Sequence, residues 1–384
     1  MFYYLSQLLM DASARTEWER FASPLRVFRY ISFRSAGAAV TALLLSWWLG
    51  PRVIAWLKQL KFGQDYTDKA EEVGQLATRI LSKKGTPTMG GLLIVLAMDL
   101  SALLWAQWNT LIQLTLLSVV VLAGLGFYDD YAKITLQTSR GTTSLIKLGV
   151  QFLLATFIGI YLLHLPSTQQ LISDVMLPFY KYPIVTGSVG VGVGLFVTIL
   201  TIVGSSNGVN LTDGLDGLAI GCVIIVSFVF LVITYLCGRP DFASYLQIPH
   251  VKGAEELTVF CAAMIGAGLG FLWFNCHPAQ VFMGDTGSLA LGGGLGIVAV
   301  LIHQPFVLVI AGGVFVAEAV SVLLQRGWFK ITKRVYGSGR RIFLMAPLHH
   351  HFEKKGWYES QIVTRFYILC VLCAVLALST LKIR

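Results

Sequence analysis

Charged residues are scarce in this chain of 384 residues, where Asp, Glu, Lys and Arg make up only 13% of the sequence. A soluble protein carries about 25% charged residues, so the composition argues against a soluble enzyme. Segments of about ten residues with alternating polarity, which a membrane β-barrel requires, are missing as well. The absence of a 20–50-residue repeat argues against a repeat array. A helical membrane protein is the class that remains.

Neither a disulfide framework nor a cleavable signal peptide is indicated. The six cysteines lie in apolar runs or at their edges, and the C-x-x-C pair Cys370 and Cys373 falls inside one run. Packing explains these thiols better than a disulfide or a metal site. The apolar N-terminus, residues 1–9, is short and acidic residues follow it from Asp11 onward, unlike a secretory signal. We expect the first membrane span to act as its own signal.

Apolar residues are abundant instead, at 55% of the chain. A helix needs about 20 such residues to cross a bilayer. Ten runs of this kind can be placed, at residues 35–57, 88–108, 110–128, 145–164, 188–206, 218–237, 257–275, 286–303, 305–326 and 362–381. The sequence therefore predicts an all-α, polytopic membrane protein with about ten transmembrane helices, formed as a single domain over residues 1–384.

The net charge of +9 is distributed in a way that predicts orientation. Alternate loops divide into two sets, and the first set covers residues 58–87, 129–144, 207–217, 276–285 and 327–361. It holds fifteen Lys and Arg residues, against three in the internal loops of the other set. The positive-inside rule places the first set in the cytoplasm. Arginines ahead of the first span argue the other way, and an interfacial helix would accommodate Arg29 and Arg34. Membrane orientation and anionic lipid thus explain the charge without nucleic acid.

All unusual polar clusters fall in this predicted cytoplasmic set. The first is Asp129-Asp130, at the end of the third apolar run. Adjacent carboxylates repel, and acids at a helix C-terminus oppose the helix dipole. A solvated helix end would account for such a pair. Its unfavourable placement indicates instead a bound cation such as Mg²⁺, or a base in catalysis.

The second cluster is the glycine-rich stretch 205–217, which contains Asn210, Asp213 and Asp216. One helical turn would put both acids on the same face. Asp followed by Gly also makes an ordinary turn, so this stretch is ambiguous when taken alone.

The third cluster is Gly284-Asp285-Thr286-Gly287-Ser288, which leads into an apolar run. Thr286 or Ser288 could cap the following helix, and free N–H groups there would seat phosphate oxygens. Asp285 beside that seat is the expected Mg²⁺ ligand. Phe282, just before it, suits base stacking or an interfacial anchor.

The fourth cluster is the histidine triplet His349-His350-His351, inside the last long loop. Consecutive side chains rarely converge on one zinc ion, so recognition of phosphate or carboxylate fits better. Two lysines are weaker candidates: Lys83, in a glycine-containing stretch without the P-loop spacing, and Lys147, at the start of the fourth run.

Carboxylates, one expected Mg²⁺, basic side chains and a helix N-terminus together indicate phosphoryl chemistry. A site at bilayer level would join a soluble nucleotide-activated compound to a lipid phosphate and release a nucleoside monophosphate. The motifs KKGTPTMGG, FYDD, NLTDGLDG, FMGDTGS and PLHHHFE, in this order and spacing, resemble those of the bacterial phospho-N-acetylmuramoyl-pentapeptide-transferase family over nearly the whole chain.

The resemblance implies transfer from UDP-N-acetylmuramoyl-pentapeptide to undecaprenyl phosphate, with release of UMP, by a Mg²⁺-dependent homodimer in the bacterial inner membrane. It implies that Asp285 binds Mg²⁺, that Asp129 acts as base or orients the lipid phosphate, and that Asp130 supports the metal or that phosphate. The implied lining of the nucleoside and diphosphate site is Lys83, Thr88, Asn210, Asp213, Leu215, Asp216, Asn275 and Phe282. Lys147 and His349 would contact phosphate or sugar, with His350 and His351 in support.

Several alternatives stay open at this point. The lipid phosphate could attack directly, which we favour, or an aspartate could attack first and form a phospho-enzyme. The substrate could instead be UDP-N-acetylglucosamine. A transporter is the alternative from another class, because glycine-interrupted helices with acids occur there too. Asp99 and Glu318 are the carboxylates expected within spans, where packing contacts would explain them.

Overall fold

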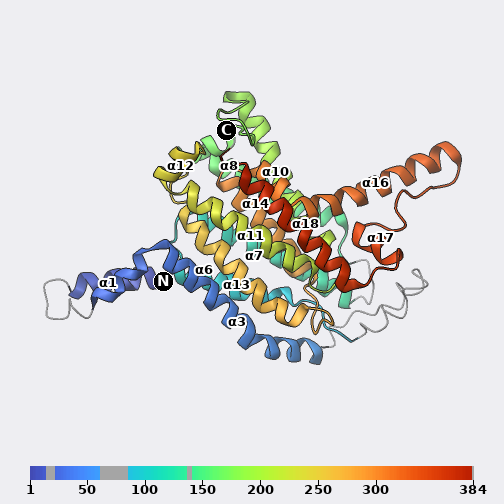
Figure 1. The fold of residues 1–384 in the computed structure, drawn as a ribbon, viewed down its shortest axis with the longest axis horizontal. Helices are drawn as coiled ribbons and strands as arrows, with labels where there is room; N and C mark the ends of the chain where they lie inside the picture. The colour runs from blue at the N-terminus through green and yellow to red at the C-terminus, as the bar shows by residue number, and fades with distance from the viewer. Residues whose placement is uncertain (14–21, 61–84, 136–140, 383–384) are drawn as a thin grey trace.

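The computed structural model describes residues 1–13, 22–60, 85–135 and 141–382, which form a bundle of helices without a β-strand (Figure 1). The elements are α1 (Phe2–Ser13), η1 (Ser23–Arg29), α3 (Ile31–Gln59), α6 (Gly91–Trp105), α7 (Thr110–Thr135), α8 (Ser144–His164), α9 (Gln170–Ser173), α10 (Gly187–Thr212), α11 (Leu218–Cys237), α12 (Pro240–Leu246), α13 (Glu255–Asn275), α14 (Gly284–Leu301), α15 (Pro305–Ala311), α16 (Gly313–Tyr336), α17 (Leu348–Lys354) and α18 (Glu359–Ser379). The predicted all-α architecture is confirmed.

Nine of the ten predicted runs each coincide with one apolar helix, and the remaining run coincides with a bent pair of helices. Within the described ranges, eight helices are long and apolar enough to cross a membrane. The run at 305–326 is divided between α15 and α16, which meet at an angle of 84°. The run at 88–108 forms α6, an apolar helix of 15 residues. A polytopic membrane protein is therefore the class that the structure supports.

Helix α14 is the centre of the bundle. Its apolar window is 89% buried, and it packs mainly against α7 and α10, with α6 and α11 also in contact (Figure 1). Small side chains along α14 allow this close approach. The N-terminus of α14, which carries Asp285, is thereby surrounded by the ends of α7 and α10.

Arg34 corrects one prediction. It lies in the first turn of α3 and is fully buried, not on an interfacial helix. Both guanidinium NH groups donate to the carboxylate of Glu256 on α13, each at 2.6 Å. That carboxylate also accepts the backbone N–H of Gln107 at 2.8 Å. Arg34 therefore joins α3 to α13 inside the protein. Arg29, by contrast, lies at the end of η1 and hydrogen-bonds to Gln7.

Helix α16 extends away from the bundle after the bend, and α17 lies beside α18 (Figure 1). The chain returns from α16 through residues 337–347, so α17 contacts both helices. This return brings the histidine triplet back to the end of the bundle that holds Asp285.

Candidate functional site

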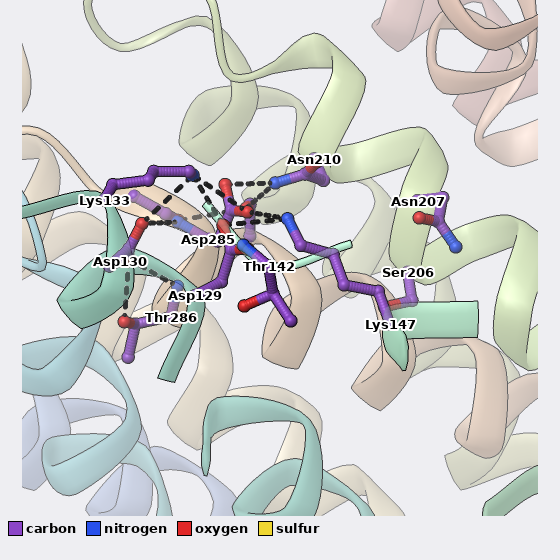
Figure 2. Close-up of polar contacts among 12 residues, drawn as sticks. Asp129, Asp130, Lys133, Thr142, Lys147, Ser206, Asn207, Asn210, Asp285 and Thr286 are labelled. Atoms are coloured by element: carbon purple, nitrogen blue, oxygen red, sulfur yellow. Dashed lines mark hydrogen bonds and ion pairs between the residues drawn. The ribbon is translucent and has the colours of Figure 1, made fainter. Parts of the chain in front are cut away.

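Three carboxylates from two helices meet at one end of the bundle (Figure 2). Asp129 and Asp130 lie in the last turns of α7, and Asp285 lies in the first turn of α14. One oxygen of each carboxylate lies within 4.8 Å of one oxygen of the others. Asp129 and Asp130 are buried, so their mutual repulsion is poorly screened by water and requires compensating positive charge.

Two lysines supply that charge. Lys133, one turn after Asp129, places Nζ 2.7 Å from Asp129 and 3.1 Å from Asp285. Lys147, near the start of α8, places Nζ 2.8 Å from Asp129 and 2.6 Å from Asp285. Both ammonium groups therefore bridge α7 and α14 (Figure 2). Three carboxylates and two ammonium groups leave the cluster with one formal negative charge.

Asp130 binds a different group from Asp129, the N-terminus of α14. Its carboxylate accepts the backbone N–H of Asp285 at 3.2 Å and that of Thr286 at 3.0 Å, and also the Thr286 hydroxyl at 2.9 Å. These N–H groups belong to the open N-terminus of α14. The expected cap by Thr286 or Ser288 is thus wrong, since neither side chain caps the helix. The predicted phosphate seat is filled by Asp130.

Helix α10 holds Asp285 from the other side. The Asn210 amide donates to Asp285 at 2.9 Å and to Ser288 at 2.8 Å. Further along, Gln151 of α8 donates to Ser206 at 2.9 Å and accepts from Asn207 at 2.7 Å. Because Gln151 lies one turn after Lys147, these bonds to α10 also fix the position of that lysine.

Mg²⁺ fits this donor set. The ion prefers oxygen ligands, with one or two carboxylates, several waters and substrate phosphates. Among the described residues, the partners of the Asp285 and Asp129 carboxylate oxygens are ammonium groups and amide N–H groups. The remaining negative charge of the cluster favours a cation. Asp130 is less available, because both of its oxygens bind the α14 N-terminus.

A close approach of α7 and α14 at Gly126 sets the spacing of the carboxylates. A Cβ on Gly126 would lie 2.2 Å from the backbone oxygen of Asp285, whereas a Cβ on Gly124 would meet nothing within 4 Å. Gly126 is one turn before Asp130 on α7. The two helices could not pack at this distance with any larger residue at position 126.

We expect Gly126→Ala to lower the free energy of unfolding by about 1–3 kcal/mol, because α7 and α14 must move apart. Activity should fall by more than about tenfold, since displacement of reacting groups by about 1 Å has large effects. Gly124→Ala is the matched control and should be neutral or slightly stabilising. Thermal unfolding in detergent and catalytic turnover would both be measured for each variant. Equal stability and equal turnover of Gly126→Ala and Gly124→Ala would contradict the conclusion that Gly126 sets the spacing.

The stretch that follows α10 is a turn, and it separates its two acids. Asp213 is the C-cap of α10, whereas Asp216 lies in the turn before α11, so the ordinary turn is the alternative that the structure supports. Asp216 is buried and accepts the backbone N–H of Ala279 at 3.1 Å, and its Oδ2 lies 3.0 Å from His277 Nδ1. Glu359 of α18 accepts the Asp216 backbone N–H at 2.8 Å.

Asn275 joins the same turn to the segment before α14. Its side-chain oxygen accepts the Gly217 N–H at 3.1 Å, and its amide donates to the Val281 carbonyl at 2.9 Å. Both ends of this buried amide are therefore satisfied within the protein. Asn275 therefore holds together two segments beside the predicted nucleoside site. Its side-chain oxygen and nitrogen both bind the protein itself.

Asp213 faces the carboxylate cluster. Burial of its carboxyl, followed by the negative charges of Asp285, Asp130 and Asp216, raises the pKa of Asp213 to about 8. In the unfolded chain the carboxyl ionises near pH 4. Between these two values the folded protein holds a proton that the unfolded chain has lost, so stability must fall as pH rises through this window.

Asp213→Asn should remove that part of the pH dependence. In metal-free buffer, the melting temperature of the variant minus that of the wild type should grow as the pH is raised from 5 to 8.5. Thermal unfolding with EDTA across this range provides the measurement. A constant difference across the range would show that Asp213 ionises in the folded protein much as it does in the unfolded chain.

The histidine triplet forms the first turn of α17, and the three rings differ in burial and in hydrogen-bond partners. His349 is buried at 1% exposure, while His350 places Nδ1 2.6 Å from Glu353, and His351 accepts the backbone N–H of Leu344 at 3.1 Å. Burial lowers the pKa of His350, and burial with the nearby Lys355 lowers that of His351. Both shifts favour the neutral ring, and a neutral ring binds phosphate by hydrogen bonding and not by charge.

The remaining predicted residues line the same end of the bundle. Thr88 is buried, and its hydroxyl would lie 2.9 Å from a Cβ on Gly284. Leu215 is buried and Phe282 is partly exposed. Backbone bonds from Phe282 to Pro87 and from Gly90 to Phe282, each 2.8 Å, hold the two segments together. Lys83 lies outside the described residues.

Sequence reasoning overlooked three participants. Lys133 is one of the fifteen basic residues that predict the orientation, and its spacing of four from Asp129 and three from Asp130 on one helix also predicts ion pairs. His277 and Glu359 both approach Asp216 and form a second cluster with it. The sequence gives no comparable signal for His277 and Glu359, because they lie 61 and 143 residues from Asp216.

Comparison with known proteins gives a consistent result. The family model described as glycosyl transferase family 4 matches residues 112–303, and phospho-N-acetylmuramoyl-pentapeptide-transferase signature 1 matches residues 83–95. A phospho-N-acetylmuramoyl-pentapeptide-transferase of Methylacidiphilum infernorum is 51% identical over 94% of this chain and 96% of its own length. The protein of that name from Desulfotalea psychrophila is 47% identical over the full length of both chains.

Proposed function

Since the chain belongs to the phospho-N-acetylmuramoyl-pentapeptide-transferase family, we propose that it transfers phospho-N-acetylmuramoyl-pentapeptide from the UDP-linked precursor to undecaprenyl phosphate, with release of UMP. One observation carries the assignment of the site: three carboxylates and two lysines converge where α7, α8 and α14 meet. Such a cluster suits phosphoryl transfer, in which catalysis consists mainly of positioning and charge stabilisation.

The reaction makes one P–O bond and breaks another. An oxygen of the lipid phosphate bonds to the phosphorus that carries the sugar. The bond from that phosphorus to the bridging oxygen breaks, and UMP leaves with that oxygen and the electron pair. Both reactants are anions, so positive charge at the site must offset their repulsion. Lys133 and Lys147 provide it from the protein.

Mg²⁺ belongs to the proposal as the cofactor, held by Asp285 with Asp129 beside it. When bound, it supplies Lewis-acid neutralisation of the diphosphate. The protein's own contribution is the orientation of these carboxylates. Asn210 and Lys147 hold Asp285, while the Thr142 backbone N–H bonds Asp129 at 2.7 Å.

Direct attack by the lipid phosphate is the mechanism that this geometry favours. Asp129 is fully buried, and two ammonium groups and one N–H bind its carboxylate. A carboxylate so well paired is a weak nucleophile, because attack would break those contacts. A phosphate oxygen is already anionic and needs little activation. Asp129 then serves to orient the lysines that receive the lipid phosphate.

The cellular setting is part of the same proposal. The positive-inside pattern supports a site that opens on the cytoplasm of a bacterium, with the chain as a single multi-pass domain in the inner membrane. Nucleotide substrates are soluble, whereas undecaprenyl phosphate arrives within the bilayer. A homodimer is the proposed assembly, to be tested by light scattering of the purified protein in detergent.

Substrate choice is the direct test of the proposed function. Purified protein with Mg²⁺ and undecaprenyl phosphate should release UMP from UDP-N-acetylmuramoyl-pentapeptide and show little release from UDP-N-acetylglucosamine. Preference for UDP-N-acetylglucosamine would favour the related transferase instead. Flux of substrate across sealed vesicles without release of UMP would favour a transporter and contradict the enzyme assignment.

A further inference from the structure

Glu318 carries a buried carboxylate that the reaction described above leaves unused. It lies near the start of α16 and has no exposed surface. Its Oε1 accepts the backbone N–H of His349 at 3.2 Å and lies 3.2 Å from Nδ1 of the same residue. Its Oε2 is buried and has no hydrogen-bond partner within the part of the chain that the structure describes. A buried carboxylate is costly unless it is paired, and His349 is the group placed to pair with it.

The His349 ring spans the distance from Glu318 to the turn after α10. Nδ1 is near Oε1, but the angle is too poor for a hydrogen bond, and Nε2 is buried without a partner among the described residues. Rotation of the Glu318 carboxylate would let its second oxygen accept a hydrogen bond from Nδ1–H. Nε2 points at the exposed Gly214, where a Cβ would lie 2.2 Å away.

A carboxylate next to Nδ1 decides which ring nitrogen carries the proton. An ionised carboxylate only accepts hydrogen bonds, so it favours the tautomer with hydrogen on Nδ1 and leaves Nε2 bare. We propose that Glu318 is a positioning residue that holds His349 in this tautomer. Nε2 is then bare and fits against Gly214, whereas a proton on Nε2 would clash with that glycine and displace the turn that carries Asp213 and Asp216 beside the proposed nucleotide site. This inference rests on the proposed function for the identity of the substrate.

A purely structural role makes a different prediction. Glu318 could serve only to accept the His349 backbone N–H in the first turn of α17. Glutamine would do this equally well, because its side-chain oxygen is also an acceptor. Glutamine can also donate to Nδ1, so it no longer selects one tautomer. Glu318→Gln therefore separates the two roles while changing the shape of the side chain very little.

The first measurement is the ¹⁵N NMR spectrum of protein labelled at its histidines, with His349 assigned by its absence in His349→Gln. The wild type should show His349 protonated on Nδ1 and bare at Nε2. The variant Glu318→Gln should show a mixture of tautomers. Wild-type protein with the proton on Nε2 would overturn the proposal, and this result requires only one folded variant, His349→Gln, for the assignment.

The second measurement is steady-state release of UMP. Glu318→Gln should raise the KM for the nucleotide substrate about tenfold, because a proton on Nε2 displaces the turn at Gly214, with little change in the KM for undecaprenyl phosphate. Glu255→Gln, which alters a partly buried carboxylate at the start of α13, is the control and should leave both values unchanged.

The outcomes keep the two proposals apart. An unchanged tautomer and an unchanged KM in Glu318→Gln would overturn the positioning role while the transferase assignment stands. If the wild type releases no UMP from any nucleotide sugar, the proposed function fails, and the NMR result still decides how Glu318 acts on His349.

Discussion

Asp285→Asn is expected to lower the rate of UMP release by about 10³-fold, the largest effect that this structure predicts for a single residue. The substitution preserves the shape of the side chain and removes one negative charge. Lys133 and Lys147 each lose an ion pair, and the proposed metal ligand becomes a neutral amide. The rate would be measured at saturating Mg²⁺ and substrates, so that weaker metal binding alone could not explain the loss.

The protein should remain folded in this variant. Asn210 donates to Oδ1 and Lys147 to Oδ2 of Asp285, so the single amide oxygen of the variant keeps one of these two bonds, and the melting temperature should fall by only a few degrees. Asp241→Asn, at an exposed site in α12, is the matched control and should retain full activity. A variant Asp285→Asn with more than about a tenth of the wild-type rate would mean that Asp285 is not central to the transfer.

Arg34→Met should destabilise the protein by about 3–5 kcal/mol, because it leaves the Glu256 carboxylate buried without its counter-ion. The pair joins α3 to α13 at 2.6 Å and is shielded from solvent. Unfolding by SDS and by heat should both show the loss. Arg29→Met, which removes an exposed arginine that bonds only Gln7 in the described structure, should change stability by less than about 0.5 kcal/mol.

A double variant checks the reason for that effect. Arg34→Met combined with Glu256→Leu removes both charges, so it should be more stable than Arg34→Met alone. The recovery should be partial, since the backbone N–H of Gln107 also loses its acceptor. Additive losses from the two substitutions would contradict the interpretation that an unpaired buried charge causes the instability.

The helices and the position of the site can be predicted from the sequence, because the length of an apolar run and the clustering of polar residues each have a direct structural consequence. Runs of about 20 apolar residues predicted the helices. Alternation of the loops predicted that Asp129, Asp285 and the histidines would lie at one end of the bundle, which their contacts confirm. The side of the membrane to which that end belongs stays a prediction.

What sequence could not predict were pairings between distant segments. Asp130 caps α14 across a separation of 155 residues, and Arg34 reaches Glu256 across 222. Local rules instead suggested a cap from Thr286 and an interfacial site for Arg34. Both expectations failed because a tertiary partner satisfied the same group better than any neighbour in sequence could.

The most direct test of the central claim is the release of UMP by wild-type protein mixed with Mg²⁺ and UDP-N-acetylmuramoyl-pentapeptide alone, followed by addition of undecaprenyl phosphate. Direct attack at the carboxylate and lysine cluster predicts no UMP before the lipid phosphate is added, and rapid release afterwards. One equivalent of UMP per protein from the nucleotide alone, with phosphate on an aspartate, would contradict it.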